Sequence, residues 1–458
     1  MEPDIVILAA GQGTRMRSSL PKVLHCLAGR PLLCHVTRTA RGLSNRPPAV
    51  VIGHGADRVK ECLAEEDIHW IIQEQQLGTG HAVQQALPVL QDQGVTLVLY
   101  GDVPLIREET LRELLDSAQK DCLSILTVKL QDPTGYGRII RADNGLVEAI
   151  VEHKDATEAQ RTISEVNTGI MAMPTALLRD WLSRLGNNNA QGEYYLTDIV
   201  AMAGSDGLPV ETVIASSWME VSGINNRAQL AQLERCFQEA AATRLMDAGI
   251  SLRDPCRFDL RGTLAHGTDI DIDVNVVIEG DVELGDRVKI GPGCVIRNSQ
   301  LGDDVVIDAN SIVEGARIEA RCTVGPFARL RPGADMREGA KAGNFVEIKK
   351  SVIGVGSKVS HLSYIGDSEL GSAVNIGAGT ITCNYDGKNK FKTEIGDGAF
   401  IGSNTALVAP VKVGAGATTA AGSVITTEVP DQALAVARGK QRNIEGWSER
   451  DASEKKEG

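Results

Sequence analysis

The stretch IDVNVV-IEGDVE-LGDRVK-IGPGCV-I, residues 272–296, decides the fold of almost half of the chain. An aliphatic residue opens each block of six, and the spacing continues to Ile425 with several five-residue steps and one long gap. An α-helix repeats about every 3.6 residues and a strand every second residue, so neither element explains this period. It is typical of a hexapeptide solenoid, in which each block forms one flat face of a triangular coil. A β-sandwich with evenly spaced turns would not keep the register over so many blocks.

These positions share small or aliphatic side chains, which we expect to point inward and to stack from coil to coil. They are Ile272, Ile278, Leu284, Ile290, Ile296, Leu301, Ile307, Val313, Ile318, Val324, Leu330, Met336, Ala342, Ile348, Ile353, Val359, Ile365, Leu370, Ile376, Ile395, Ile401, Leu407, Val413, Thr419 and Ile425. A glycine often follows, as in Ile290-Gly291, and eases the corner. The long gap, residues 377–394, predicts an external loop, because insertions in solenoids leave the coil.

Composition narrows the class of protein. A chain of 458 residues has room for two or three domains, and a net charge of −13 argues against a nucleic-acid or anionic-membrane partner. The nine cysteines are scattered, odd in number and without a CxxC pair. This favours reduced thiols over a disulfide framework or a zinc site. The first residues, MEPDIVILAAG, do not read as a signal peptide, so we expect a cytoplasmic protein.

The residues before the solenoid follow an α/β pattern. Strand-like runs at Asp4–Ala10, Ala49–Ile52, Thr96–Tyr100 and Leu123–Lys129 alternate with helical stretches such as Thr110–Gln119. This alternation predicts a largely parallel sheet covered by helices. The expected organisation is a Rossmann-like α/β domain over 1–226, a linker helix over 227–250 and a β-helix domain over 251–458, with a disordered charged tail from Trp447.

A glycine-rich turn follows the first strand-like run, in LAAGQGTRM (8–16), and LPK (20–22) comes shortly after it. Backbone N–H groups at such a turn bind phosphate well. Met16 stands where a dinucleotide fingerprint has its third glycine, and the Walker GK[ST] is missing. Arg15 and Lys22 could neutralise a triphosphate and a leaving pyrophosphate. A tight turn with two surface cations is the alternative that spacing alone leaves open.

Two further segments favour a nucleotide site. LVLYGD, residues 97–102, places Asp102 where an apolar strand ends, which is the edge at which α/β sheets bind ligands. Asp102 is a candidate Mg²⁺ ligand, and a turn-capping aspartate is the alternative. QEQQLGTGH, residues 73–81, supplies amides, glycines and a hydroxyl suited to reading the edge of a base.

With LAAGQGTRM, LPKVLH, LGTGHA and LYGDVPLI, the N-terminal half resembles the sugar-nucleotidyltransferase (pyrophosphorylase) family. The attached solenoid narrows the resemblance to the bifunctional N-acetylglucosamine-1-phosphate uridylyltransferases fused to a glucosamine-1-phosphate N-acetyltransferase. PTGYGR (133–138), VEHKD (151–155), NTG (167–169) and GINNR (223–227) stand where that family has them. The resemblance covers residues 4 to about 447.

For the N-terminal half the resemblance implies a set of ligand-binding residues. It assigns Gln73, Gly78 and Thr79 to the uracil, Gly137, Glu152 and Asn167 to N-acetylglucosamine, Tyr100 to substrate binding, Asp102 and Asn225 to Mg²⁺ with Asn225 also meeting substrate, and Arg15 and Lys22 to the phosphates during catalysis. Gln12 stands at a variable position often held by Lys. One side-chain contact to phosphate is therefore expected to be missing.

One histidine in the solenoid, His361, has polar and cationic neighbours. It lies in KVSHLSY, residues 358–364, near the gap in the repeats. A lone histidine is more often structural, and that is the alternative. Polar and cationic residues recur at related positions on successive coils, however, and they are Arg331, Lys349, Tyr364, Asn375, Asn384 and Tyr385. These polar and cationic neighbours favour a functional role for His361.

The resemblance gives this cluster an acetyl-transfer role. An amine attacks a thioester only when unprotonated, so a base with a near-neutral pKa is needed, and histidine suits that task. His361 is the expected base, Glu347 could orient its ring, and backbone N–H groups over 375–379 could hold the oxyanion. The resemblance assigns glucosamine 1-phosphate to Arg331, Lys349, Tyr364 and Asn375, and acetyl-CoA to Ala378, Asn384, Tyr385, Ser403, Ala421 and Arg438.

The resemblance further implies a left-handed β-helix and a homotrimer with acetyl-transfer sites between subunits. The predicted function is acetyl-CoA-dependent acetylation of glucosamine 1-phosphate, followed by Mg²⁺-dependent transfer of uridylyl from UTP. The product, UDP-N-acetylglucosamine, would serve as a precursor of peptidoglycan, the bacterial cell wall and lipopolysaccharide. Two alternatives stay open: a single-function sugar-1-phosphate nucleotidyltransferase with a structural solenoid, and a non-enzymatic nucleotide sensor on an oligomerising scaffold.

Overall fold

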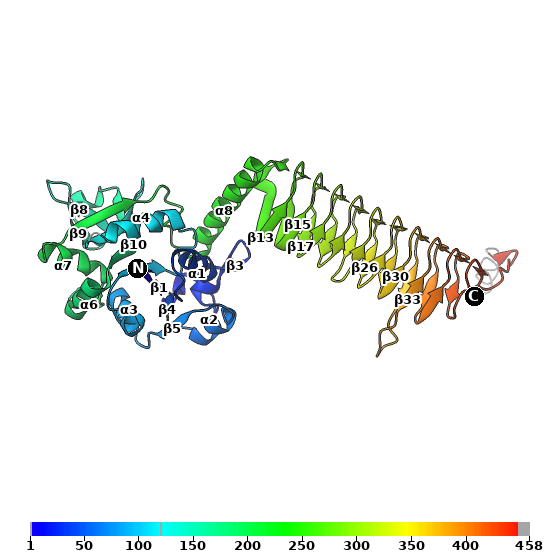
Figure 1. Cartoon of the computed structure of the whole chain (residues 1–458), viewed down its shortest axis with the longest axis horizontal. Helices are drawn as coiled ribbons and strands as arrows, with labels where there is room; N and C mark the ends of the chain where they lie inside the picture. Colours follow the sequence, from blue (N-terminus) through cyan, green and yellow to red (C-terminus); the bar gives the residue numbers. More distant parts are fainter. Residues whose placement is uncertain (1, 120, 190, 448–458) are drawn as a thin grey trace, which may run out of the picture. The chain divides into compact units, whose positions relative to one another are not determined.

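The computed structural model of the protein describes residues 2–119, 121–189 and 191–447. The chain forms two compact units, Met1–Ala240 and Ala241–Gly458, and each is described by itself. The division falls inside helix α8 (Arg227–Asp247), which is labelled in Figure 1. The part of the tail that we expected to be disordered, residues 448–458, lies outside the described residues.

A twisted sheet forms the centre of the N-terminal unit, with strand order β11-β7-β10-β6-β1-β4-β5. The strands are β1 (Asp4–Leu8), β4 (Ala49–Ile52), β5 (His69–Ile72), β6 (Val95–Tyr100), β7 (Leu123–Lys129), β10 (Glu165–Pro174) and β11 (Val210–Ile214), with small pairs at β2 (Cys26–Leu27) and β3 (Arg30–Pro31) and at β8 (Arg138–Arg141) and β9 (Val147–Val151). All pairings along the main order are parallel except those of β10, which is antiparallel to β6 and β7. The α/β prediction is confirmed, with this one strand reversed.

Helices cover both faces of the sheet because alternate residues of each strand point to opposite sides. Ile5 and Ile7 of β1 pack with one set of helices, and Val6 and Leu8 pack with the other. The first set is α1 (Leu32–Leu43), α2 (Ala56–Cys62) and α4 (Glu108–Ala118), and the second is α3 (Thr79–Ala86), α6 (Thr175–Arg184) and α7 (Ile199–Ser205). A short helix, α5 (Glu158–Arg161), follows β9. The sheet thus lies between two apolar layers.

The first part of α8 belongs with the N-terminal unit and is more than a connection. Leu233 is buried in a cluster with Met16 and Ile224. The backbone N–H of Ala28 donates to Glu234 Oε2 at 2.7 Å. Met16 belongs to the glycine-rich turn, so this part of the helix packs against that turn.

The C-terminal unit is a solenoid of short parallel strands arranged in two sheets (Figure 1). The 11-stranded sheet contains β12 (Ser251–Leu252), β14 (Asp271–Ile272), β16 (Lys289–Ile290), β19 (Val306–Ile307), β22 (Thr323–Val324), β25 (Lys341–Asn344), β28 (Lys358–His361), β31 (Asn375–Ile376), β34 (Phe400–Ile401), β37 (Thr418–Thr419) and β39 (Leu434–Ala435). Each of these strands pairs with the equivalent strand of the next coil, as in Ile272 with Ile290 and Ile290 with Ile307.

The 17-stranded sheet supplies the other faces of the coils. Its strands are β13 (Phe258–His266), β15 (Val276–Leu284), β17 (Val295–Arg297), β18 (Gln300–Leu301), β20 (Ile312–Glu314), β21 (Arg317–Ile318), β23 (Arg329–Leu330), β24 (Asp335–Met336), β26 (Glu347–Lys349), β27 (Val352–Ile353), β29 (Tyr364–Gly366), β30 (Ser368–Leu370), β32 (Ile381–Cys383), β33 (Thr393–Ile395), β35 (Ala406–Val408), β36 (Val411–Val413) and β38 (Val424–Ile425). Every position of the six-residue series is at most 4 % exposed. The predicted parallel solenoid is confirmed, and its left-handedness stays a prediction.

The gap in the series is shorter than the sequence indicated. We predicted an external loop over residues 377–394, but β32 continues the coil and places Thr382 in the inward position, 1 % exposed. The Thr382 hydroxyl accepts from the Gly366 N–H at 2.8 Å, so a polar residue fits the core without an unpaired group. The excursion runs over residues 384–392 and folds back through a bridge between Tyr385 and Lys390. Figure 1 shows it leaving the coils beside β33.

Over residues 2–119, 121–189 and 191–447, the structure contains no helix whose length and hydropathy would let it span a bilayer.

Candidate functional site

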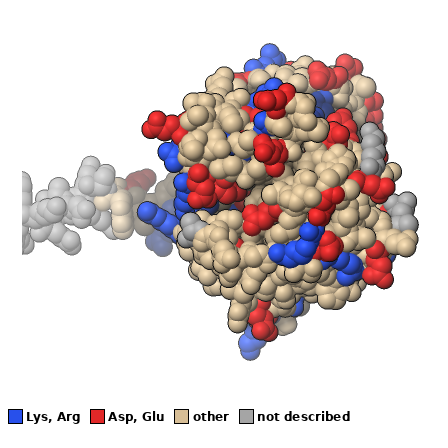
Figure 2. All heavy atoms as spheres, turned by 90° about the vertical axis from the view of Figure 1, so that its left-hand side faces the viewer, with Lys and Arg blue, Asp and Glu red and all other residues tan. Residues whose placement is uncertain are grey.

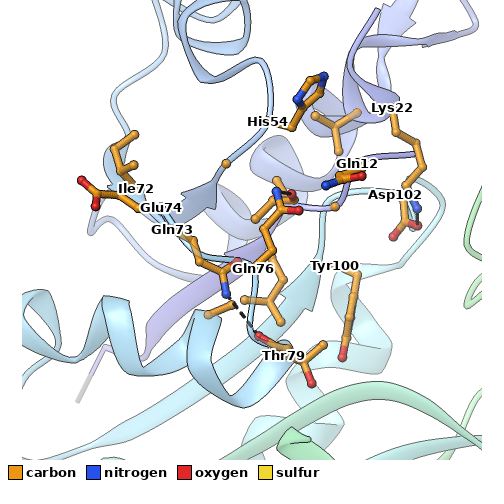
Figure 3. A pocket seen from close by; sticks show the side chains of 18 of the residues that line it. Gln12, Lys22, His54, Ile72, Gln73, Glu74, Gln76, Thr79, Tyr100 and Asp102 are labelled. Atoms are coloured by element: carbon orange, nitrogen blue, oxygen red, sulfur yellow. Dashed lines mark hydrogen bonds and ion pairs between the residues drawn. The ribbon is translucent and has the colours of Figure 1, made fainter. Parts of the chain in front are cut away.

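Two neighbouring strands bring the predicted phosphate and metal residues together. β1 and β6 are parallel, and Leu8 pairs with Tyr100 at their carboxyl ends. The loops that follow these strands therefore meet. Lys22 Nζ donates to Asp102 Oδ2, and these two side chains lie together at one end of the pocket in Figure 3.

Asn225 joins the same cluster from a distant part of the chain. Its Oδ1 accepts from Lys22 Nζ at 3.1 Å and from Arg15 Nη2 at 2.8 Å. The two oxygens that we predicted as metal ligands are thus both in contact with cationic groups. Carboxylate and amide oxygens are ligands that Mg²⁺ accepts, but a bound cation would have to replace Lys22 and Arg15 as their partner.

A glycine with a left-handed backbone allows this arrangement. Gly13 has φ +62°, and a Cβ there would lie 2.6 Å from Lys22 Cβ. Any other residue would push Lys22 away from the turn. The glycine-rich turn thus places Lys22 as well as presenting N–H groups.

The main cavity of the N-terminal unit extends from this cluster along the sheet edge and has a volume of about 910 Å³, a size typical of small-molecule sites. The predicted base-reading residues Gln73, Gly78 and Thr79 line it, as do the backbone of the glycine-rich turn and Gln12. The Gln73 amide is 3 % exposed, and its Nε2 lies 3.0 Å from His81 Nδ1. Figure 3 shows Gln73 and Thr79 at the opposite end from Lys22.

A second pocket adjoins the first and collects the predicted sugar-binding residues. Gly137, Glu152 and Asn167 line it, and Tyr100 and Thr79 are shared with the main cavity. The Asn167 N–H donates to the Gly137 carbonyl at 2.8 Å, which holds two of these segments together. Burial raises the pKa of Glu152, and the nearby Asp155 acts in the same direction. A partly desolvated carboxyl of this kind suits hydrogen bonds to sugar hydroxyls.

Tyr100 connects the separate parts of the site. It lines the main cavity, the second pocket and a third pocket that contains Arg15 and Asn225. Burial raises the pKa of its phenol, and the carboxylates of Asp102 and Glu152 add to that effect. The ring therefore stays neutral and works as a wall between the pockets.

Gly169 is required by this ring. Its φ is +86°, and a Cβ there would lie 2.7 Å from Tyr100 Cε2. Gly169→Ala should therefore displace the Tyr100 ring and also strain the backbone, at a cost of roughly 1–3 kcal/mol for the left-handed conformation alone. We expect a lower midpoint of thermal unfolding, measured by circular dichroism.

The matched control is Gly145→Ala, because Gly145 has φ +84° and an added Cβ there would meet no atom within 4 Å. It carries the backbone cost without the clash. An equal drop in both variants would mean that the Tyr100 contact contributes nothing.

The segment EYYLT, residues 193–197, is part of this site, although the sequence reasoning missed it. The Gly80 N–H donates to the Tyr194 carbonyl at 2.8 Å, and the Leu196 N–H donates to Thr79 Oγ1 at 3.1 Å. A Cβ on Gly78 would lie 2.6 Å from the Tyr194 oxygen, which explains that glycine. The chain has only six tyrosines, and the two adjacent ones in this segment could have indicated its role from the sequence.

On the face of the molecule drawn in Figure 2, the described Lys and Arg side chains are interspersed with Asp and Glu, without a broad basic area. This surface lacks the continuous positive stripe that a nucleic acid requires.

In the C-terminal unit, register places several predicted residues on one corner. His361, Ala378, Ser403 and Ala421 each come three residues after the first residue of β28, β31, β34 and β37, and those first residues pair in sequence. The Asn404 N–H donates to the Ala378 carbonyl at 2.7 Å, which ties adjacent corners together. Arg438 Nη1 donates to the Ala421 carbonyl at 2.7 Å, so Arg438 joins the row.

His361 is exposed on this corner, and its ring contacts a residue that we did not predict. Its Nδ1 lies 2.6 Å from Asn344 Oδ1. We expected Glu347 to orient the ring, but Glu347 Oε1 accepts from Arg331 Nη1 at 2.8 Å instead. The expectation was wrong because Glu347 follows the corner and lies on the next face, where it pairs with Arg329 of the preceding coil and its carboxylate contacts Arg331. Asn344 lies one coil, 17 residues, before His361. This spacing of one coil could have indicated from the sequence that Asn344 lies beside His361.

Three cations meet on the face next to the corner. Arg331 and Lys349 hold equivalent places on consecutive coils, because each follows the paired residues Leu330 and Ile348. Lys390 comes from the excursion, and it lowers the pKa of Lys349 more than any other group, with Arg331 acting in the same direction. Like charges gathered in this way favour binding of an anion. Lys390 falls inside the loop predicted over residues 377–394, and its position there did not indicate this role.

The remaining predicted residues divide between two faces. Tyr364 pairs with Glu347 on the face of the three cations, and a Cβ on Gly366 would lie 2.4 Å from its hydroxyl. Asn384 is buried there and donates to Asp367 Oδ2. Tyr385 is 60 % exposed on the excursion. Asn375, in contrast, lies in the 11-stranded sheet, so a single chain does not bring it beside Tyr364.

Comparison with known proteins agrees with both halves of this description. Residues 5–188 match the MobA-like NTP transferase domain, and residues 272–298 and 392–427 match the bacterial transferase hexapeptide (six repeats). The chain is similar to the bifunctional protein GlmU of Cellvibrio japonicus (strain Ueda107), with 60% identity over 444 residues, which are 97% of this chain and 98% of that protein.

Two solved structures are also similar. One is a UDP-glucose pyrophosphorylase complexed with UDP-glucose, with 15% identity over 52% of this chain and 100% of that chain and a TM-score of 0.44. The other is a nucleotidyl transferase from Methanothermobacter thermautotroptrophicus, with 20% identity over 52% of this chain and 99% of that chain and a TM-score of 0.37.

Proposed function

This chain belongs to the family of bifunctional GlmU proteins, and on that premise we propose that its two units catalyse successive transfers. The C-terminal unit acetylates glucosamine 1-phosphate with acetyl-CoA. The N-terminal unit joins the resulting N-acetylglucosamine 1-phosphate to UTP, giving UDP-N-acetylglucosamine and pyrophosphate. The observation that carries the proposal is that 60% identity extends over 97% of the chain and so includes both units.

In the N-terminal unit the proposed role of each residue follows from the pocket that it lines. Gln73, Gly78 and Thr79 bind the uracil in the main cavity. The N-acetylglucosamine lies against Gly137, Glu152 and Asn167 in the adjoining pocket, with Tyr100 between the two. The sugar phosphate and the triphosphate then meet at the end of β6, where the cationic cluster lies.

Asp102 and Asn225 would hold Mg²⁺ at this point. Their carboxylate and amide oxygens are ligands that Mg²⁺ accepts together with substrate phosphates, and both oxygens already contact the positive charges of Lys22 and Arg15. When bound, the ion would neutralise charge on the phosphates. The triphosphate gives Lys22 and Arg15 alternative partners.

The uridylyl transfer is a displacement at phosphorus. A phosphate oxygen of the sugar phosphate attacks the α-phosphorus of UTP, and the bond to pyrophosphate breaks. Arg15 and Lys22 offset the negative charge that grows on the leaving pyrophosphate. Glycine-rich backbone N–H groups supply further donors, which makes the loss of a side-chain contact at Gln12 tolerable.

In the C-terminal unit His361 acts as the base. It removes a proton from the sugar amine, the amine attacks the thioester carbonyl, and coenzyme A leaves as the thiol. Arg331, Lys349 and Lys390 hold the phosphate and Tyr364 contacts the sugar, while the acetyl-CoA lies along Ala378, Ser403 and Ala421 with Arg438, Asn384 and Tyr385 nearby.

We also propose that the protein is a cytoplasmic homotrimer with acetyl-transfer sites between subunits. Asn375 and the cations lie on different faces of the solenoid, so a neighbouring chain is needed to bring such residues together. Exposed apolar residues at the corners, among them Phe327 and Phe345, would be covered on assembly. Sedimentation equilibrium should give three times the chain mass, and a monomer would contradict this arrangement.

The test of the function is to incubate the protein with glucosamine 1-phosphate, acetyl-CoA, UTP and Mg²⁺ and to analyse the products by mass spectrometry. We expect UDP-N-acetylglucosamine. Formation of a nucleotide sugar only when N-acetylglucosamine 1-phosphate is supplied would favour a single-function enzyme instead. No nucleotide sugar in either case would reject the proposal.

Lys390 should matter for binding more than for turnover. Because it belongs to the anion-binding group, Lys390→Ala is expected to raise the KM for glucosamine 1-phosphate about 10-fold, equal to about 1.4 kcal/mol, with kcat nearly unchanged. Initial rates of coenzyme A release measure both. Lys388→Ala removes an equal charge from the same exposed excursion and is the matched control. A similar KM in both variants would count against the phosphate role.

A further inference from the structure

We propose that Asn344 is a positioning residue for acetyl transfer, which accepts the Nδ1 proton of His361 and leaves the Nε2 lone pair free to act as the base. This inference rests on the acetyl-transfer function proposed above for the same corner. It adds a residue that lies outside the set of substrate contacts.

Register holds Asn344 and His361 together. They are paired residues of β25 and β28, one coil apart in the 11-stranded sheet. The backbone adds a second connection, since the Leu362 N–H donates to the Asn344 carbonyl at 3.0 Å. The residue after Asn344, Phe345, has φ +56° and stacks on Phe327 with ring centres 5.4 Å apart. The corner that carries Asn344 is therefore supported on both sides.

The chemistry of the contact determines the tautomer. Asn344 Oδ1 is a carbonyl oxygen and can only accept a hydrogen bond. At 2.6 Å from Oδ1, the Nδ1 atom of His361 must carry the proton. In the neutral ring the other nitrogen, Nε2, then has the free lone pair that proton abstraction needs.

A neutral orienting group affects how the rate of acetyl transfer depends on pH. A carboxylate in this place would stabilise the imidazolium form of His361, whereas an amide adds no charge. The one carboxylate near this corner that we had considered, Glu347, pairs with Arg331. The base can thus be oriented without being held in its protonated form.

Other charged and titratable groups surround this corner. They are Lys341 on β25, Lys358 on β28, Glu347 and Lys349 on β26, Tyr364 on β29, Arg331 and Lys390 in the cation group, and Asp367, whose carboxylate acts on Lys349. β31, the next strand of the same sheet, contributes Asn375 and no charge. Substitutions at position 344 leave all of these groups in place, so a change in the pH profile reports on that position.

The test compares Asn344→Ala and Asn344→Asp in the full-length protein, with Lys341→Ala on the same strand as the matched control. For Asn344→Ala we expect kcat for acetyl transfer to fall roughly 10-fold to 100-fold, part of the gain from a positioned base, with KM for both substrates within about 2-fold. Asn344→Asp retains an acceptor and should keep more activity than Asn344→Ala at high pH. Its acid limb in kcat/KM should move up by about one pH unit, since an added carboxylate stabilises the protonated ring.

Each outcome decides one point. Full kcat in Asn344→Ala, or an unshifted acid limb in Asn344→Asp, would overturn the inference. If His361→Ala itself keeps its acetylation rate, the proposed acetyl-transfer site fails instead. Thermal unfolding of the solenoid by circular dichroism, unchanged relative to Lys341→Ala, separates lost positioning from a damaged coil.

Discussion

We expect His361→Ala to abolish acetyl transfer and to leave uridylyl transfer intact, which is the largest effect that we predict for a single substitution. A positioned base contributes roughly 10²–10⁴-fold to a rate, and the imidazole is the group at this corner suited to removing a proton near neutral pH. His361 is exposed, so truncation leaves neither a cavity nor an unpaired buried group. Coenzyme A release with a thiol reagent measures the first activity, and pyrophosphate release from UTP and N-acetylglucosamine 1-phosphate measures the second.

The matched control is His266→Ala, at the other histidine of the solenoid. Its Nδ1 lies 2.9 Å from the Gly267 carbonyl at the start of the coils, away from the corner row. We expect wild-type rates from it. Loss of both activities in His361→Ala would indicate a folding defect, and a retained acetylation rate would remove His361 from the mechanism.

Asp102→Asn should have the opposite signature, with uridylyl transfer reduced by roughly 10²–10³-fold and acetyl transfer unchanged. The substitution keeps the shape of the side chain and removes the charge that pairs with Lys22 and would bind the cation. Mg²⁺ binding in the presence of UTP, measured by isothermal titration calorimetry, should weaken together with the rate.

Asp143→Asn is the control, because it removes one exposed carboxylate from the same unit outside the three pockets described. Its Mg²⁺ affinity and rate should match the unchanged protein. Normal uridylyl transfer in Asp102→Asn would show that the metal assignment is wrong.

Much of the fold followed from local pattern. A six-residue period fixes which side chains point inward, so Ile272 to Ile425 could be placed in the core without any knowledge of the path between coils. The strand at Leu123–Lys129 and the one at Ala49–Ile52 have the predicted bounds, because buried strands read as short apolar runs. Thr382 was not predicted as a core residue, because a polar residue interrupts the aliphatic six-residue series. Its hydroxyl is nevertheless hydrogen-bonded inside the coil.

The sequence by itself determined the two-part architecture, the motifs and the residue types that each reaction needs, because these depend on neighbours within a few positions. Contacts between distant residues were decided only by the tertiary structure. Asn225 reaches Lys22 across 203 positions, and Lys390 approaches Lys349 through a folded excursion. Asn344 rather than Glu347 meets His361 because the coil turns at the corner between them. The direction that the chain takes after a turn decides which of these distant residues meet, and the local repeat in the sequence does not contain that information.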